Sequence, residues 1–156
     1  MKIMKKILAT IIVGILSVFL ITACSKKKTT ESIEFKNFIY EKTEDGYTIL
    51  GVKDKTITNI TISNRFTSIN DKAFEGCTNL KTITMPHTIT TIYSNAFDGC
   101  DSLDKVFYYG TKDYYMQIGY NFNDSVTVYY YSENKPESAG SFWHYDNGVP
   151  TVWVMN

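Results

Sequence analysis

The side chains best suited to catalysis or metal binding are few in this 156-residue chain. Its two histidines, His87 and His144, are far apart in the sequence. No H-E-x-x-H, G-x-S-x-G, C-x-x-C or glycine-rich phosphate-binding motif accompanies them. Because a function must be argued from a site and the sequence presents none of these, we expect a non-enzymatic protein with no cofactor and no metal.

Cys77 and Cys100 are the two side chains most able to react with each other. They occupy equivalent positions in two copies of a repeat, so we expect them on adjacent coils with Cα atoms roughly 5 Å apart. That separation permits a disulfide, but equivalent side chains of stacked coils point in parallel. Free cysteine is also among the most buried residue types. We therefore expect two reduced thiols in the core, with a disulfide as the alternative.

Three aspartates of the second copy have the spacing D-x-x-D-x-x-D, which invites comparison with calcium sites. They are Asp98, Asp101 and Asp104, and the matching positions of the first copy hold a glutamate, a threonine and a lysine. Calcium needs about six to eight converging oxygen ligands. We therefore expect these aspartates at ordinary solvent-facing positions.

Cys24 is the third cysteine, and it ends a distinctive N-terminal segment. A basic start with three lysines precedes an uncharged apolar run over residues 7–23. This order predicts a secretory signal peptide at 1–23, and the run is short for a membrane-spanning helix, which needs about 20 apolar residues. The stretch I-T-A-C-S resembles the lipobox of bacterial lipoprotein signal peptides. That resemblance implies lipidation of Cys24, with acyl chains such as palmitate. The alternative is an ordinary signal peptide or anchor helix with an incidental cysteine.

The resemblance also implies a mature lipoprotein held at the extracytoplasmic face of the cell membrane. Residues 24–37 are polar and are predicted to form a flexible tether. Three of the 16 basic residues precede Cys24, whereas all 16 acidic residues follow it, so the mature chain would be slightly acidic. The only basic cluster, residues 26–28, lies beside the anchor, where it would either contact anionic head groups or simply be solvated. We expect no nucleic-acid partner, because such binding needs a basic patch.

The elements that position these residues come from a 23-residue unit that occurs twice over residues 66–111. The superposed pairs include Ala73 with Ala96, Phe74 with Phe97, Gly76 with Gly99, Cys77 with Cys100 and Leu80 with Leu103. A period of this length predicts a solenoid, in which each unit buries its apolar face against its neighbours.

Within the unit, each segment has a predicted structure. Residues 80–85 have the L-x-x-I-x-M spacing of a strand, which residues 57–62 and 103–108 share. Residues 71–76 are predicted to form a short helical turn whose glycine takes a positive φ. The alternate strand positions are predicted to face outward and to form an interaction surface. These positions are Asn59, Thr61, Thr82, Thr84, Lys105 and Phe107.

The combined pattern I-x-x-x-A-F-x-G-C-x-x-L-x-x-I-x-x-P-x-x-I-x-x-I resembles the BspA-type leucine-rich repeats of bacterial surface proteins over residues 57–111. The resemblance implies an α/β solenoid: a short leucine-rich repeat stack of about 2.5 coils, with parallel strands, short helical turns and β-rich N- and C-terminal caps. The second copy departs from the pattern at residues 108–110, where Tyr-Tyr-Gly replaces Met-Pro-His. This is typical of a last repeat that merges into a cap.

We predict one leucine-rich repeat domain over residues 38–156. Residues 38–62 form the N-terminal cap and first strand, residues 63–110 the repeats, and residues 111–156 a C-terminal helix and β-hairpin cap. Thr111 is the predicted N-cap of that helix, with Tyr115 in place of the tryptophan found in similar proteins. An Asn-Gly pair at 147–148 predicts a hairpin with Trp143 opposite Val152 and Tyr145 opposite Pro150.

The last 50 residues are rich in tyrosine, phenylalanine and tryptophan. Most must pack the cap, and a few exposed ones would suit protein or carbohydrate contacts. We expect a surface-exposed interaction module, and the resemblance implies adhesion or host-protein binding. A stack of this length offers a strand face of roughly 600–800 Å², at or below one side of a standard interface. The alternatives are a structural or accessory envelope lipoprotein with one partner, and a carbohydrate-binding protein that uses the aromatic cap.

Overall fold

The computed structural model describes residues 35–154. The chain divides into two compact units, Met1–Lys36 and Asn37–Asn156, and the second contains every strand and the helix given below. Cys24, the signal peptide at 1–23 and nearly all of the predicted tether lie outside the described residues. Within the described part, no helix is long and apolar enough to cross a membrane.

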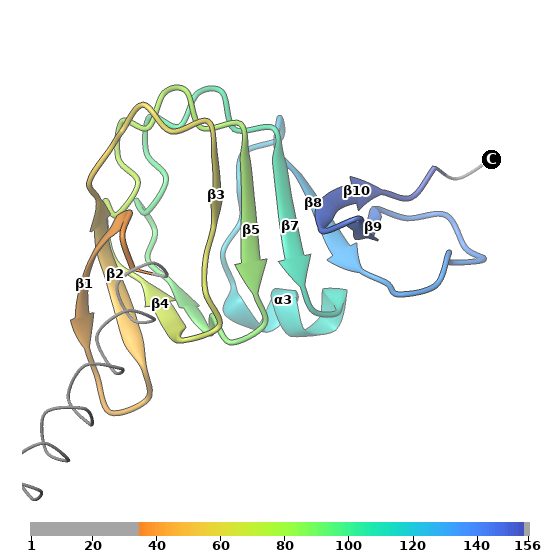
Figure 1. Ribbon diagram of the computed structural model, residues 1–156, viewed down its shortest axis with the longest axis horizontal. Coiled ribbons are helices and arrows are strands. Elements are labelled where there is room, and N and C mark those ends of the chain that lie inside the picture. Colours follow the sequence, from red (N-terminus) through yellow and green to blue (C-terminus); the bar gives the residue numbers. More distant parts are fainter. Residues whose placement is uncertain (1–34, 155–156) are drawn as a thin grey trace, which may run out of the picture. The chain divides into compact units, whose positions relative to one another are not determined.

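The second unit is built from two sheets (Figure 1). The larger sheet has the order β10-β9-β8-β7-β5-β3, and the smaller sheet has the order β1-β2-β4-β6. The strands of the larger sheet are β3 (Asn59–Thr61), β5 (Thr82–Pro86), β7 (Lys105–Tyr109), β8 (Thr127–Tyr131), β9 (Phe142–Asp146) and β10 (Val149–Val152). Those of the smaller sheet are β1 (Phe38–Lys42), β2 (Tyr47–Val52), β4 (Phe66–Ile69) and β6 (Thr91–Ile92).

The parallel pairing follows the 23-residue repeat. Asn59 of β3 lies opposite Thr82 of β5, which lies opposite Lys105 of β7. In the smaller sheet, Ile69 of β4 lies opposite Ile92 of β6. Each repeat therefore contributes one strand to each sheet, and the predicted solenoid of parallel strands is confirmed.

The parallel ladder continues past the second repeat. Lys105 of β7 pairs in parallel with Thr127 of β8, and Tyr131 of β8 pairs in parallel with Trp143 of β9. The segment that the sequence marks as a cap thus adds strands to the repeat sheet. Because a helix replaces the repeat turn before β8, the 23-residue pattern stops although the ladder does not.

The turns between the two sheets stack through backbone contacts. Cys77 N–H donates to the carbonyl of Phe74 at 3.1 Å, which closes a tight turn within one coil. Phe74 N–H donates to the carbonyl of Ala96 at 2.8 Å, which joins that coil to the next. Gly76 and Gly99 have φ values of 71° and 70°, as predicted. The small alanine and the glycine let the two backbones approach at this spacing.

A column of phenylalanines fills the space behind these turns. Phe74 and Phe97 stack with ring centroids 4.8 Å apart and planes 12° apart, so they touch across the coil interface. Phe38 meets Phe74 edge-on at 6.5 Å, and Phe122 packs on Phe97 at 5.0 Å. The N-terminal cap and the segment after the helix therefore close this column at its two ends.

The N-terminal cap is an antiparallel β1–β2 hairpin, with a turn at residues 44–46 between the strands. Its second strand pairs in parallel with β4, where Ile49 lies opposite Ile69. The hairpin thus extends the smaller sheet, and β3 forms the end of the larger one (Figure 1).

The C-terminal cap begins with helix α3 (Lys112–Ile118). The Thr111 hydroxyl accepts the Tyr114 N–H at 3.4 Å, which confirms the predicted N-cap, and Tyr115 is buried. The β9–β10 hairpin has the predicted register, with Trp143 opposite Val152 and Tyr145 opposite Pro150. Its two turn residues, at 147–148, have φ values of 49° and 79°, which are those of a type I′ turn.

Candidate functional site

The two repeat cysteines are free thiols in the core, as predicted, and they form no disulfide. The Cys100 thiol donates a hydrogen bond to the carbonyl of Phe74 at 3.2 Å. Burial raises the pKa of Cys100 to about 12 and also raises the pKa of Cys77. Since the thiolate is the nucleophile, both side chains are poorly reactive at neutral pH. They serve packing and not chemistry.

The other titratable candidates lie apart from one another. His87 is exposed in a repeat loop, and His144 stacks on Trp153 with ring centroids 3.8 Å apart. Asp98, Asp101 and Asp104 are all exposed. Across residues 35–154, no group of three histidine, cysteine, aspartate or glutamate side chains is placed to hold a metal ion.

The outer face of the larger sheet carries the predicted interaction residues. Four of them reach solvent, and we call them the polar ladder: Asn59, Thr61, Thr82 and Lys105. The Thr82 hydroxyl donates to the Asn59 side-chain oxygen at 2.6 Å, which links β3 to β5. Lys105 pairs with the neighbouring Asp104, and this hydrogen bond raises the pKa of Lys105. The polar ladder is therefore an ordered row of donors and acceptors.

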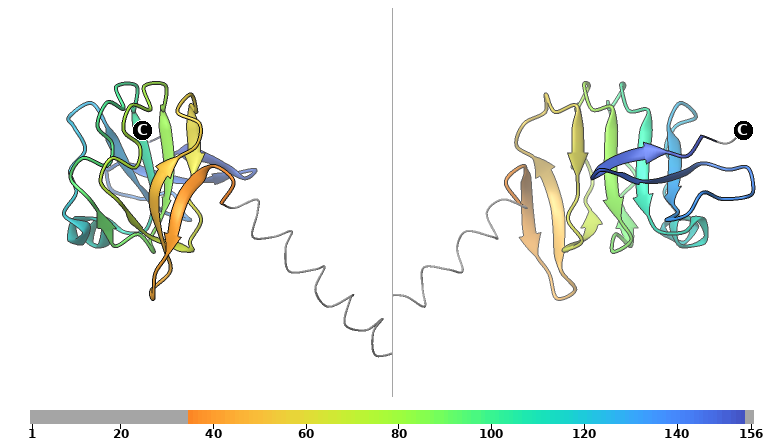
Figure 2. Two further views of the ribbon diagram at one scale, coloured as in Figure 1. Left: turned by 90° about the vertical axis from the view of Figure 1, so that its left-hand side faces the viewer. Right: turned by 45° about the vertical axis from the view of Figure 1, so that its right-hand side comes forward.

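The prediction that Thr84 and Phe107 are also exposed is wrong. They are only 8% and 6% exposed. Phe107 packs against Trp143 with ring centroids 5.4 Å apart, and the Trp143 indole N–H donates to the carbonyl of Tyr108 at 2.9 Å. Figure 2 shows the β9–β10 hairpin standing in front of the outer face at its β8 end. The hairpin thus brings Trp143 against Phe107, which points outward from its strand.

Beyond the polar ladder, the outer face of the larger sheet carries tyrosine side chains. Tyr109 and Tyr131, at the ends of β7 and β8, stack with centroids 4.2 Å apart. Tyr145 lies 5.0 Å from Trp143 and remains exposed. The outer face therefore changes from polar on β3 and β5 to aromatic on β7, β8 and β9. The sequence indicated an aromatic cap, but no local signal indicated that the cap lies against this face.

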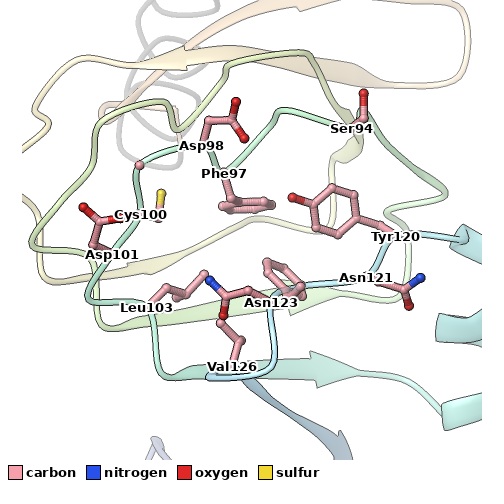
Figure 3. A pocket seen from close by; sticks show the side chains of 12 residues that line it. Ser94, Phe97, Asp98, Cys100, Asp101, Leu103, Tyr120, Asn121, Asn123 and Val126 are labelled. Atoms are coloured by element: carbon pink, nitrogen blue, oxygen red, sulfur yellow. The ribbon is translucent and has the colours of Figure 1, made fainter.

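A pocket of about 360 Å³ lies at the end of the phenylalanine column, beside Cys100 (Figure 3). Its floor is Phe97, against which Tyr120 packs at 5.8 Å. Burial raises the pKa of Tyr120. Tyr120 and Phe122 occupy the place that a third repeat turn would take, and they fill it incompletely. The pocket is thus a consequence of ending the stack.

Parallel strands recurring every 23 residues, with stacked turns and a phenylalanine at each turn, define a leucine-rich repeat solenoid. The chain belongs to the BspA-type leucine-rich repeat family, described as "BspA type Leucine rich repeat region (6 copies)", whose family model matches residues 52–135. Proteins with leucine-rich repeats are typically non-enzymatic binding modules.

Two solved structures are similar to the chain. One is a leucine-rich cell surface protein from Faecalibacterium prausnitzii A2-165, with 33% identity over 40% of this chain and 17% of that one, and a TM-score of 0.40. The other is the T. pallidum Leucine Rich Repeat protein, with 22% identity over 61% of this chain and 51% of that one, and a TM-score of 0.43. The chain thus spans about half of one and a sixth of the other. A comparison with curated proteins found no match.

Proposed function

We propose that this protein is a lipid-anchored module of the bacterial cell surface that binds another protein through the outer face of its larger sheet, with adhesion as its role. The observation that carries the proposal is the polar ladder, an ordered row of solvent-facing polar groups on a rigid sheet. A rigid, pre-ordered surface binds with a smaller loss of conformational entropy than a flexible one.

The neighbouring tyrosines supply the apolar part of such an interface. Tyr109 and Tyr145 are exposed beside the polar ladder, and tyrosine is enriched among the residues that contribute most to binding. Since Thr84 and Phe107 are buried, the polar part of the face is smaller than the sequence suggested. The small area favours one partner, which is also what the alternative of an accessory envelope lipoprotein requires.

The interface is tested by capture experiments with the full-length lipidated protein against envelope fractions and host-matrix fractions. Thr82→Arg places a long charged side chain in the polar ladder and should abolish capture of the partner. Thr91→Arg is the matched control, because Thr91 is an exposed threonine on β6 of the other sheet. Equal loss in both variants, or loss in neither, contradicts the assignment. A partner found in host matrix supports adhesion, whereas one found in the envelope supports the accessory role.

The anchor is tested separately. We expect the precursor to be cut before Cys24 and Cys24 to be acylated, because the basic start, the apolar run and the cysteine follow in the lipoprotein order. Cys24→Ala should leave the precursor uncut or release the protein from the membrane, as measured by cell fractionation and by intact-mass analysis. Unchanged processing together with unchanged membrane retention would exclude a lipid on this residue.

A further inference from the structure

A pocket of about 400 Å³ lies where β7 passes into α3, and its walls are mainly tyrosine. We call it the tyrosine pocket. Its lining is His87, Tyr109, Gly110, Thr111, Tyr114 and Tyr131. This volume lies within the range of about 300–1,000 Å³ that is usual for small-molecule sites.

The walls of the tyrosine pocket are held in place by regular elements. The rings of Tyr109 and Tyr131 stack with centroids 4.2 Å apart. Tyr114 lies in the first turn of α3, whose start is fixed by the Thr111 cap. Tyr114 is 64% exposed, and its ring stacks on no other ring within residues 35–154. An aromatic face left open to solvent on a fixed helix turn serves no purpose in packing.

A second cavity of about 230 Å³ adjoins the tyrosine pocket, because His87 and Tyr114 line both. Gln117 and Thr90 add an amide and a hydroxyl to its wall. Together the two cavities form a groove with two compartments. No lysine, arginine, aspartate or glutamate lines either compartment.

We propose that this two-compartment groove binds a neutral oligosaccharide, with one sugar ring in each compartment. A pyranose ring has an apolar face that packs on a tyrosine ring and a rim of hydroxyls that donate and accept hydrogen bonds. The groove offers both: open tyrosine rings, and an imidazole, an amide and several hydroxyls around them. Its uncharged lining gives nothing to neutralise a phosphate or a carboxylate. A proline-rich peptide also packs on aromatic rings, but proline rings would leave these donors unused.

The experiment titrates the full-length protein in detergent with neutral tetrasaccharides, namely tetra-N-acetylchitotetraose, cellotetraose and maltotetraose, and follows amide shifts by NMR. We expect at least one to bind and to shift Tyr114 and Gln117. Tyr114→Ala should weaken that binding about tenfold or more, whereas Tyr114→Phe should retain most of it because the ring remains. Tyr93→Ala is the matched control, since Tyr93 is 51% exposed and lies outside both compartments. It should leave binding unchanged.

Because Tyr114 is exposed, its alanine variant should fold, and its melting temperature verifies this. The proposal is overturned if none of the three tetrasaccharides binds at a sugar concentration of about 10 mM, which exceeds the dissociation constant of even a weak, millimolar complex. It is also overturned if Tyr114→Ala binds as well as the unchanged protein, or if a polyproline peptide occupies the groove in preference to the sugars. Thr82→Arg separates this site from the proposed protein interface, because it lies in the polar ladder and should not affect sugar binding.

Discussion

At the scale of single residues, position within the stack decides what a side chain does. Cys77 and Cys100 are equivalent in sequence, and both are buried thiols without a disulfide. Their burial follows from the repeat, because each coil covers the one before it. Thr84 and Phe107 occupy equally regular positions, yet both are buried, and Trp143 of a hairpin distant in the sequence packs on Phe107. Periodicity therefore predicts the inward-facing residues well, and it does not predict which outward-facing residues stay exposed.

The first prediction concerns the thiols. In the native protein at neutral pH, Cys77 and Cys100 should react slowly with an alkylating reagent, because they are buried and their pKa values are raised. After denaturation without reductant, both should react fully. Peptide-resolved mass spectrometry distinguishes them from Cys24. Fast native labelling would contradict burial, and absent labelling after denaturation would indicate a disulfide.

The second prediction compares two glycines with the same backbone conformation. Gly99 and Gly119 have φ values of 70° and 71°. A Cβ at Gly99 would lie 3.4 Å from the Cα and N of Gly76, whereas a Cβ at Gly119 would have nothing within 4 Å. Gly119→Ala should therefore cost only the conformational strain of about 1–2 kcal/mol, and Gly99→Ala should cost more. Denaturant melts measure both, and equal costs would mean that the coils do not approach this closely.

At the scale of helices and strands, short sequence motifs were sufficient to predict those features that depend on local contacts. The Asn-Gly turn predicted the β9–β10 register, and Thr111 predicted the start of α3. The parallel pairing of β8 with β7 had no such signal, because it depends on α3 replacing a repeat turn. The position of the hairpin depends on long-range contacts of Trp143, which pairs with Tyr131, packs on Phe107 and donates to the carbonyl of Tyr108. Such contacts leave no periodic pattern in the sequence.

The third prediction concerns the phenylalanine column. Phe74→Ala and Phe97→Ala should each lower the free energy of unfolding by about 3–5 kcal/mol, because each removes a buried ring. The loss of unfolding free energy in the double variant should differ from the sum of the two single losses, since the two rings are in contact. Urea denaturation measures all three.

The controls for that series come from the outer face. Thr82→Ala should cost under about 1 kcal/mol, as expected for a surface change. Thr84→Ala should cost more than Thr82→Ala, because Thr84 is buried beside Phe107. If Thr82 were as sensitive as Phe74, the inner and outer faces of β5 would have been assigned the wrong way round.

At the scale of the whole molecule, the core contains several thiol and phenol side chains, and burial disfavours their ionised forms. Burial raises the pKa values of Cys100, Tyr108 and Tyr115. A group whose pKa is higher in the folded than in the unfolded state keeps its proton more tightly when folded. The contribution of such a group to the free energy of unfolding is fully present below its pKa in the unfolded state. It is lost as the pH rises toward its pKa in the folded state. For Cys100 this window runs from pH 9.0 to about 12.

The fourth prediction is that the free energy of unfolding is level near neutral pH and falls above pH 9. Cys100→Ala, although less stable at neutral pH, should show a shallower decline between pH 9.0 and about 12, because one of the titrating groups is gone. Urea denaturation at a series of pH values gives both curves. Parallel curves would show that the Cys100 thiol is not shielded from solvent in the folded state.

The regular register has a consequence for how proteins of this kind change over generations. Asn59, Thr82 and Lys105 follow one another at a constant interval, and the hydrogen bond from Lys81 N–H to the carbonyl of Thr58 recurs as the bond from Asp104 N–H to the carbonyl of Lys81. An in-frame duplication of one 23-residue unit would therefore insert a complete coil and leave both ends unchanged. It would lengthen the outer face by about 4.8 Å, the spacing of neighbouring strands. Successive duplications would therefore enlarge the outer face of the protein in equal steps, because each copied unit already fits its neighbours.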